Sequence, residues 1–189
     1  MKISILLPYK ENFSHEYAGA VSLFIRDTTQ ISKLKKYITV YGNTDLKNVF
    51  KLNYKNINLK KNIIQSGSKF YVNEFLKYEK KSPSDILEIH NRPAYIESIT
   101  KKVDTKIVLY FHNDPLSMLG SKSVDERLNI LNNTYKIVFN SEWSKKRFLT
   151  KLNKFYHKSN KLEVIHQSTN RVKINLSQKV SIRKIENKL

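Results

Sequence analysis

Residues 85–115 read DILEIHNRPAYIESITKKVDTKIVLYFHNDP, and this stretch decides the fold class. The segment 85–90 is short and mostly apolar, 94–102 carries apolar residues at helical spacing, and 106–112 is a second apolar run. Short, continuous apolar runs are typical of strands buried in a parallel sheet. A strand, a helix and another strand in this order predict a βαβ unit.

The same alternation continues on both sides of this unit. Further strands are expected at 3–8, 37–42, 135–141 and 162–167, with a weak strand near 49–52 or 57–59. Further helices are expected at 16–34, 68–80, 123–132 and 142–155. The apolar face of the first is expected to carry Ala20, Leu23, Phe24, Ile31 and Leu34, and the core-facing residues of the last are expected to be Trp143, Leu149, Leu152 and Phe155. The pattern predicts an α/β fold, a Rossmann-like open parallel sheet flanked by helices and joined by right-handed crossovers. We expect this domain to span residues 1–168.

The two strands of the opening stretch end in the same phrase. Each continues with His-Asn, then a charged residue, then Pro, at 90–93 and at 112–115. In an open parallel sheet, ligands bind outside the carboxyl ends of the strands. The sequence therefore predicts a polar crevice built from strand-end loops, with candidate residues His90, Asn91, Arg92, His112, Asn113 and Asp114.

Structural explanations exist for parts of this pattern. Asn91 fits the N-cap of the next helix, so both a capping and a functional role stay open there. After His112 no helical pattern resumes until Ser123, and a long polar loop favours function. Ser141, in the NSEWS phrase, fits an N-cap. The spacing of the histidines matches no zinc motif, so we expect no metal site.

The charge of the chain is strongly positive. Among its 189 residues, 35 Lys and Arg against 16 Asp and Glu give a formal charge of +19. Such a field attracts nucleic acid, anionic lipid or phosphorylated ligands. Only six of the cations are Arg. Since Arg performs the bidentate contacts of base recognition, dedicated nucleic-acid binding is not expected.

Other classes of protein are excluded by what the sequence lacks. There is no Cys, which rules out disulfides, Cys-ligated metal and a thiol nucleophile. No apolar run is long enough to span a bilayer, and the first apolar run is too short for a signal peptide. We expect a cytoplasmic protein. The basic helix expected at 142–155 adds the expectation of a peripheral contact with the inner face of an anionic membrane.

The ordered set of phrases resembles the N-terminal half of family-4 glycosyltransferases, which have the GT-B fold. The matching phrases, over about residues 1–170, are KISILLP, EYAGAVSLFIRD, VLYFHNDP, YKIVFNSEWSKKRFL and LEVIHQSTN. The sequence departs from the family at two places. The first loop usually has paired glycines where this chain has Ala18-Gly19-Ala20, and the last strand usually ends in Pro-Asn-Gly where this chain has His166-Gln167-Ser168.

The resemblance implies transfer of a sugar from a nucleotide-sugar donor to a glycan or lipid-linked acceptor, as in glycan or lipopolysaccharide biosynthesis. Anomeric configuration would be retained, and neither a cofactor nor an essential metal is implied. His112 would line the reaction centre as the catalytic residue, and Gly19 would lie near the donor phosphates. Arg92 and Asp114 would hold acceptor hydroxyls or charge, and Asn113 and Ser141 would complete the substrate site.

Members of that family carry a second Rossmann-like domain that grips the nucleotide, and nothing in these 189 residues corresponds to it. The segment 169–189 is polar and basic, and we expect a linker or tail toward such a C-terminal domain. The chain alone would then be an incomplete enzyme. The alternative is a stand-alone basic module that binds nucleic acid or anionic membrane without catalysis.

Overall fold

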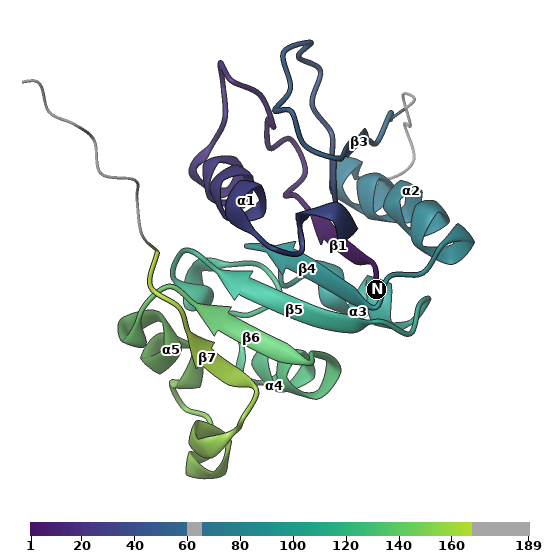
Figure 1. Cartoon of the computed structure of the whole chain (residues 1–189). Helices are drawn as coiled ribbons and strands as arrows, with labels where there is room; N and C mark the ends of the chain where they lie inside the picture. The colour runs from purple at the N-terminus through teal and green to yellow at the C-terminus, as the bar shows by residue number, and fades with distance from the viewer. Residues whose placement is uncertain (60–65, 168–189) are drawn as a thin grey trace, which may run out of the picture.

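The computed structural model describes residues 1–59 and 66–167, which form one seven-stranded sheet (Figure 1). The order across the sheet is β3-β2-β1-β4-β5-β6-β7, so the chain starts near the middle and fills one side before the other. Every strand pair is parallel, which confirms the α/β, Rossmann-like sheet. The strands are β1 (Ile3–Leu6), β2 (Ile38–Gly42), β3 (Tyr54–Asn56), β4 (Ile86–His90), β5 (Lys106–Phe111), β6 (Lys136–Phe139) and β7 (Leu162–Val164).

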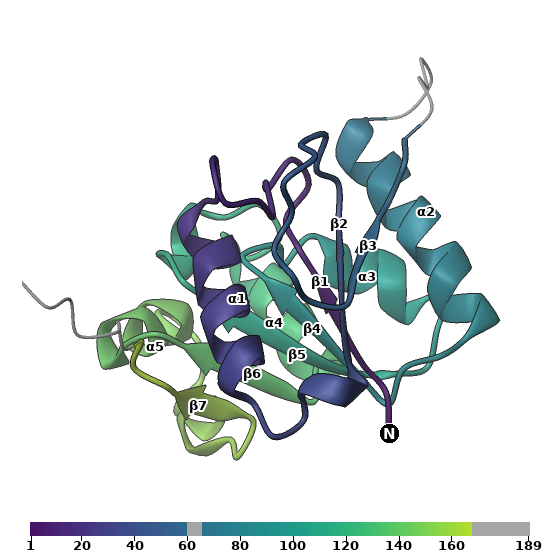
Figure 2. The ribbon, with the colours of Figure 1, turned by 45° about the horizontal axis from the view of Figure 1, so that its top comes forward.

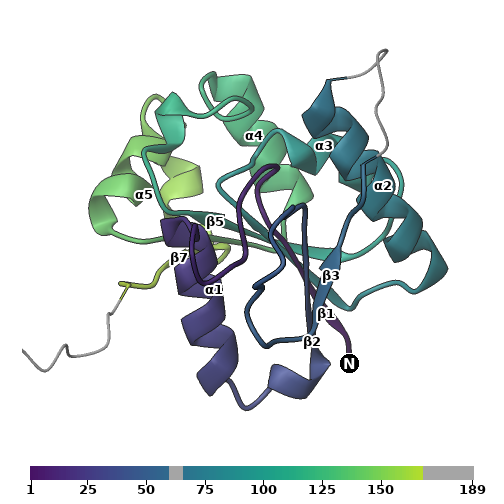
Figure 3. The ribbon, with the colours of Figure 1, turned by 90° about the horizontal axis from the view of Figure 1, so that it is seen from above.

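The α-helices of the described residues lie in two layers, one on each side of the sheet (Figure 3). Helix α1 (Ala20–Ile31) follows β1 and leads toward β2, in the opposite direction along the sheet from the later crossovers. Because crossovers are right-handed, α1 lies on one face and the others on the opposite face. Those others are α2 (Gly67–Lys81), α3 (Tyr95–Thr100), α4 (Val124–Asn133) and α5 (Glu142–Leu149). Single 3₁₀ turns are η1 (Lys35–Tyr37), η2 (Pro115–Ser117) and η3 (Lys154–Lys158).

Each face of the sheet has its own apolar core. The larger cluster packs the strands against α2–α5, and its fully buried side chains include Leu87, Leu109 and Phe139. The smaller cluster packs β1 and β2 against α1 through residues such as Ile5 and Ile25. In Figure 1 no helix of the described chain stands in front of β5, β6 and β7, so the α1 side is open there.

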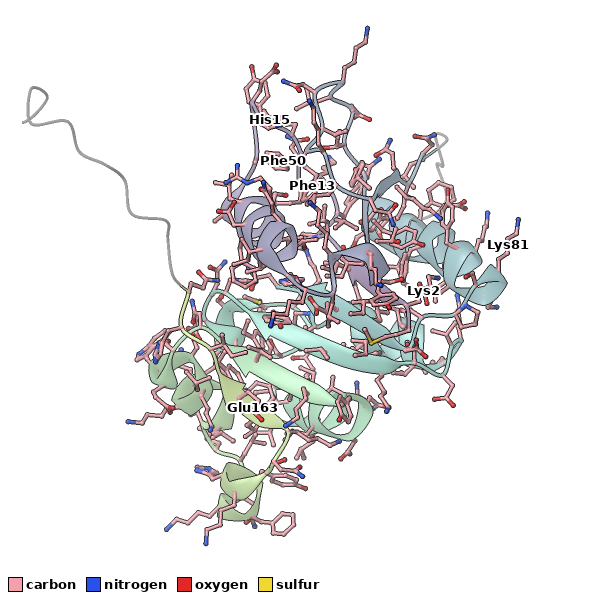
Figure 4. The ribbon with its side chains drawn as sticks, in the orientation of Figure 1. Lys2, Phe13, His15, Phe50, Lys81 and Glu163 are labelled. Atoms are coloured by element: carbon pink, nitrogen blue, oxygen red, sulfur yellow. The ribbon has the colours of Figure 1, made fainter. Side chains whose placement is uncertain are left out.

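Two loops at the carboxyl edge of the sheet pack on each other. The ring of Phe50 meets Phe13 edge-to-face at 5.0 Å and His15 at 4.7 Å (Figure 4). Ser14 forms an isolated antiparallel bridge with Val49. The loop between β1 and α1 is therefore held in place by contacts outside its own strand and helix, at the edge of the sheet where the crevice was predicted.

Helix α1 is shorter than the predicted 16–34, and its apolar face was predicted wrongly. Leu23 is 39% exposed and Ile31 is 84% exposed, although both were expected to pack. The buried face of the helix is rotated by about one residue from the predicted face, and it includes small polar side chains. The buried residues of α1 are Val21, Ser22, Ile25 and Thr29.

The weak strand lies at neither of its two predicted positions. Strand β3 is Tyr54–Asn56, in register with Val40–Gly42 of β2. The side chain of Asn53 donates to the carbonyl of Ile38 at 3.2 Å and to the hydroxyl of Thr39 at 2.7 Å. These side-chain hydrogen bonds fix the register of the two strands. The polar segment 54–56 therefore pairs with β2, in place of the more apolar segments that were predicted. The apolar Val49 contacts the first loop instead.

The last predicted helix, 142–155, ends early. Helix α5 stops at Leu149, and Lys151 has a left-handed φ of 62° that breaks the helical path. Leu149 and Leu152 are buried as expected. Trp143 and Phe155 were expected in the core but are 58% and 79% exposed. The break turns Phe155 onto η3, away from the sheet.

Candidate functional site

The predicted crevice residues meet at the carboxyl edge of the sheet. His90 is the last residue of β4 and His112 follows β5 directly. Asn140 and Ser141 follow β6, and Gly19 is the N-cap of α1. Cα partners in parallel strands point to the same face, so His90 and its partner Tyr110 both face α1. Figure 2 shows α1 passing over this part of the sheet.

The two histidines contact each other directly. Nδ1 of His90 lies 2.8 Å from Nε2 of His112, a distance that requires one shared proton between the two rings. The His90 ring is 1% exposed and stacks on Tyr110 with centroids 4.6 Å apart and planes 11° apart. Phe24 of α1 meets His112 edge-to-face at 5.0 Å. The two histidines of the repeated His-Asn phrase therefore belong to one aromatic cluster with Tyr110 and Phe24.

The backbone of His112 is fixed from both neighbouring strands. Its N–H donates to Oδ1 of Asn91 at 2.7 Å, and its carbonyl accepts from Nδ2 of Asn140 at 2.7 Å. Asn91 has a left-handed φ of 51°, a conformation that Asn tolerates better than most residues. The amide of Gln167, beyond β7, contacts Nδ1 of His112. His112 is thereby held in one place and one orientation.

His112 is uncharged at neutral pH. Its pKa is lowered from 6.5 to about 3, mainly by burial and in smaller part by the neighbouring His90. A neutral imidazole offers one hydrogen-bond donor and one acceptor. Since one ring nitrogen of His112 is engaged with His90, the other is the group that reaches toward the edge of the sheet.

Asp114 is engaged with another side chain. Its carboxylate forms a two-point pair with Arg147 of α5, at 2.9 Å and 3.2 Å, and also accepts from the Leu116 amide at 3.1 Å. The hydrogen bond from Arg147 lowers the pKa of the Asp114 carboxyl. The structure thus places Asp114 in the expected loop, where it caps η2 and ties the loop to α5.

Arg92 and Asn113 keep more of their polar groups accessible. Arg92 is half-buried, and its guanidinium donates to the Asn91 carbonyl at 2.8 Å. No carboxylate of residues 1–59 and 66–167 lies within ion-pair distance of Arg92. Asn113 is exposed beside His112. These two side chains can contact a ligand without first breaking an ion pair.

Gly19 is in contact with an acidic side chain that the sequence analysis did not single out. The carboxylate of Glu11 lies against the first turn of α1, where Oε1 accepts from the Ser22 amide at 3.2 Å. A Cβ at Gly19 would lie 3.0 Å from Cδ of Glu11 and closer still to one oxygen. The expected place of the donor phosphates therefore holds a carboxylate, which accepts a hydrogen bond from the Ser22 amide of that helix turn.

Ser141 caps α5. Its hydroxyl accepts from the Ser144 amide at 3.2 Å, as an N-cap does. The neighbouring Asn140 supports His112 and was missed as a site residue. Its position directly after a strand, beside Ser141, is the signal that could have found it. Glu11 and Gln167 carried no comparable signal, because their contacts join segments far apart in the sequence.

A cavity of about 300 Å³ opens beside the histidine cluster, on the α1 side of the sheet. Phe24, Glu88 and Tyr110 line it, and Thr28 and Ser32 add hydroxyl groups from α1. A larger hollow of about 880 Å³ lies near the amino edge, between the end of α4 and residues 154–161, and includes none of the strand-end residues. The smaller cavity is lined by Phe24, Glu88 and Tyr110, which contact the histidine pair.

Two further observations concern the described residues alone. Within residues 1–59 and 66–167, no three His, Asp or Glu side chains come together in a way that could hold a metal ion. In the same ranges, no helix has both the length and the apolar character needed to cross a bilayer. The predicted tail at 169–189 lies outside the described residues.

No protein-family model matches the sequence, and no curated protein matches it either. Solved structures do match the fold. Sucrose-phosphate synthase from Thermosynechococcus elongatus aligns with a TM-score of 0.61 and 11% identity, over 90% of this chain and 49% of that one. A second solved chain of that enzyme gives 0.57 and 10%, over 98% of this chain and 99% of the other.

Anabaena HepE, solved in complex with UDP-glucose, aligns with a TM-score of 0.65 and 11% identity, over 99% of this chain and 51% of that one. This chain thus spans about half the length of HepE and of the first sucrose-phosphate synthase chain. At such low identity the likeness establishes the fold. The described domain has the Rossmann-like α/β fold found in these proteins. His112 and its partners lie at the carboxyl edge of the sheet, the edge at which open α/β sheets generally bind ligands.

Proposed function

We propose that this chain is the acceptor-side half of a retaining glycosyltransferase of the GT-B type. It would use a nucleotide-sugar donor and a glycan or lipid-linked acceptor. The observation that carries the proposal is His112, neutral and fixed at the carboxyl edge of the sheet. The alignment of 99% of the chain with a protein solved with UDP-glucose supports it.

The chemistry of sugar transfer suits these groups. A departing nucleotide develops negative charge on phosphate, and the two substrates must be oriented by hydrogen bonds to their hydroxyls. A neutral His112 would bind a hydroxyl of the transferred sugar, as the catalytic residue of this half. Arg92 and Asn113 would contact the acceptor, with Arg92 suited to a carboxylate or phosphate on it. Asp114 would act by holding this loop against α5.

The donor phosphates would approach the first turn of α1 at Gly19. Glu11 now accepts a hydrogen bond from an amide of that turn, so the two anions would compete for the same groups. Donor binding in this proposal requires the Glu11 side chain to swing away. A long, flexible side chain permits that movement, because within residues 1–59 and 66–167 its carboxylate accepts only the hydrogen bond from the Ser22 amide.

In this proposal, a second domain would supply the other half of the donor site. HepE and the first sucrose-phosphate synthase chain extend over about twice the matched length. We propose a C-terminal GT-B domain as the partner that supplies most nucleotide contacts. Without it the donor stays solvated and poorly oriented, and the contribution of positioning to the rate is lost.

Two measurements test this function. The first titrates the 15N-labelled chain with UDP-glucose and maps the amide shifts. We expect weak binding, with shifts gathered at residues 19–24, 90–92 and 112–113. His112→Gln should weaken it, and the control His157→Gln, in η3 at the amino edge, should not. Shifts confined to other parts of the chain, or none at saturating sugar nucleotide, would refute the proposed site.

The second measurement is a transfer assay with labelled nucleotide sugars. The 189-residue chain alone should give no useful turnover, and a family-type C-terminal domain added in trans should raise it. Robust turnover by the chain alone would show that the donor site is complete within these residues or across a homodimer, and that the missing-half part of the proposal is wrong.

A second candidate function rests on one observation, the 79% exposed Phe155 on η3. Lys154 and Lys158 flank it, and a basic, aromatic tip of this kind suits an anionic membrane surface. The test is vesicle co-sedimentation. Phe155→Ser should reduce binding to anionic vesicles while Tyr37→Ser, another exposed aromatic beside lysines, should not. Equal binding to neutral and anionic vesicles would exclude this candidate, and a steep loss of duplex DNA binding with salt would favour nucleic acid instead.

A further inference from the structure

A line of three side chains runs along the α1 side of β4 and β5. Oε2 of Glu88 lies 3.6 Å from Nε2 of His90, and Nδ1 of His90 lies 2.8 Å from Nε2 of His112. Glu88 is partly exposed in the cavity beside α1, His90 is buried, and His112 reaches the edge of the sheet. The line therefore connects the cavity to the candidate catalytic residue.

The position of the proton on His90 follows from its surroundings. Nε2 of His90 is buried and has no hydrogen-bond partner among the described residues, yet it faces the carboxylate of Glu88. A nitrogen lone pair turned toward a carboxylate in a site with little water is repelled, whereas an N–H turned toward it is attracted. The neutral ring of His90 is therefore favoured with its proton on Nε2, which leaves Nδ1 as an acceptor.

The proton on His112 is then determined as well. If Nδ1 of His90 accepts, Nε2 of His112 must carry the proton that lies between the rings. Nδ1 of His112 keeps its lone pair, and the side-chain amide of Gln167 faces that nitrogen as a donor. All four groups then have compatible roles. The Glu88 carboxylate faces the N–H of His90, His90 accepts from the N–H of His112, and His112 accepts from the amide of Gln167.

We propose that His90, oriented by Glu88, is a positioning residue that holds His112 as the neutral Nε2–H tautomer and so presents the Nδ1 lone pair at the edge of the sheet. In the proposed sugar transfer, on which this part rests, that lone pair accepts a hydrogen bond from a hydroxyl of the transferred sugar. Gln167 marks the place: its amide occupies the acceptor nitrogen until a hydroxyl displaces it.

The surroundings of the pair support a single tautomer. In the described part of the chain, the titratable groups facing the two rings are Glu88 on β4 and Tyr110 on β5, while α1 presents the apolar Phe24. Burial and the neighbouring His90 keep the pKa of His112 far below neutral. Stacking on Tyr110 fixes the plane of the His90 ring. A half-turn of the ring within that plane would put a carbon in the place of Nδ1 and break the 2.8 Å contact with His112.

The tautomer is measurable without any substrate. Long-range 1H–15N correlation on the 15N-histidine-labelled chain separates protonated from unprotonated ring nitrogens. In the unsubstituted chain we expect His112 with a protonated Nε2 and an unprotonated Nδ1, unchanged between about pH 8 and pH 5, the window in which an ordinary His titrates. At pH 8, His90 should also carry its proton on Nε2.

Three variants separate positioning from packing. His90→Leu removes the acceptor, and the Nδ1 and Nε2 resonances of His112 should shift toward the averaged values of a mixture. His90→Gln keeps an acceptor oxygen and should restore the single tautomer. Glu88→Gln alters a partly exposed group and should shift His90, and through it His112, toward the mixture. His15→Gln, remote from the pair, is the control.

The outcomes are distinct. A Nδ1–H tautomer of His112 in the unsubstituted chain, or an unchanged spectrum of His112 in both folded His90→Leu and folded Glu88→Gln, would overturn the positioning role. If His90→Leu does not fold, the unsubstituted chain and Glu88→Gln decide it. The expected tautomer together with no UDP-glucose binding would instead reject the proposed transfer and leave the positioning intact.

Discussion

Glu11 caps α1 through the amide of Ser22, eleven positions further along the chain. The contact puts a negative charge on the first helical turn, where unpaired N–H groups favour anions. It also explains the glycine before the helix, because a Cβ at Gly19 would collide with that carboxylate. The first three predictions test this cap and the neutrality of His112.

Gly19→Ala should lower the free energy of unfolding by about 1 kcal/mol, the usual value of an N-cap interaction. The backbone at Gly19 has φ −75°, which Ala adopts without strain, so the cost would come from the displaced carboxylate. Urea unfolding of Gly19→Ala, Glu11→Ala and the double variant measures it. The double variant should be no less stable than Glu11→Ala, and full additivity would show that the two residues act independently.

Glu11→Gln should tighten the binding of UDP-glucose several-fold, because a negative charge near the helix terminus is worth about 0.3–1 kcal/mol there. The amide still accepts from Ser22 but no longer repels phosphate. Isothermal titration of the two proteins measures the change. Glu16→Gln, an exposed carboxylate lost from the same loop, is the matched control. An equal gain in both variants would mean that only net charge matters.

His112 should make the protein less stable as the pH falls. Its pKa is depressed to about 3 in the folded state and is 6.5 when exposed, so the unfolded chain binds the extra proton between these values. Stability therefore rises with pH across this window. From pH 7 to pH 4.5 the unsubstituted chain should lose roughly 2–3 kcal/mol more than His112→Gln. Urea unfolding of both proteins at the two pH values measures this difference. An equal loss of stability in the two proteins would contradict a buried neutral His112.

Asp114→Asn should lower the Tm at neutral pH, because it breaks the two-point pair with Arg147 that ties the loop after β5 to α5. The pKa of the Asp114 carboxyl is depressed in the folded state, so its contribution is present above the ordinary value of 3.8 and is lost as the pH falls through the folded value. The Tm difference between the two proteins should therefore narrow below about pH 4.

The control for that pair is Glu97→Gln, which breaks the exposed pair of Glu97 with Lys101 on α3. Exposed pairs of this kind contribute little, so its Tm should stay near that of the unsubstituted chain. A Tm difference for Asp114→Asn that stays constant down to pH 3 would show that the carboxylate charge does not carry the effect.

The sequence by itself determined the parallel α/β fold, because continuous apolar runs separated by helical periods bury well in only one kind of sheet. The same runs showed that His90 and His112 end neighbouring strands. Local chemistry also identified Ser141 as a cap, since an N-cap bond joins residues three apart. These conclusions depend on interactions within one element or between successive elements.

Only the tertiary structure decided which atoms meet. The His90–His112 contact joins residues 22 apart, the Asp114–Arg147 pair joins residues 33 apart, and the Gln167–His112 contact spans 55. Periodicity gives the phase of a helix only to within about one residue, which is why Ile31 was expected to pack and is exposed. The role of each polar side chain at the edge of the sheet depends on which partner three-dimensional packing brings within hydrogen-bond distance, and no local pattern encodes that choice.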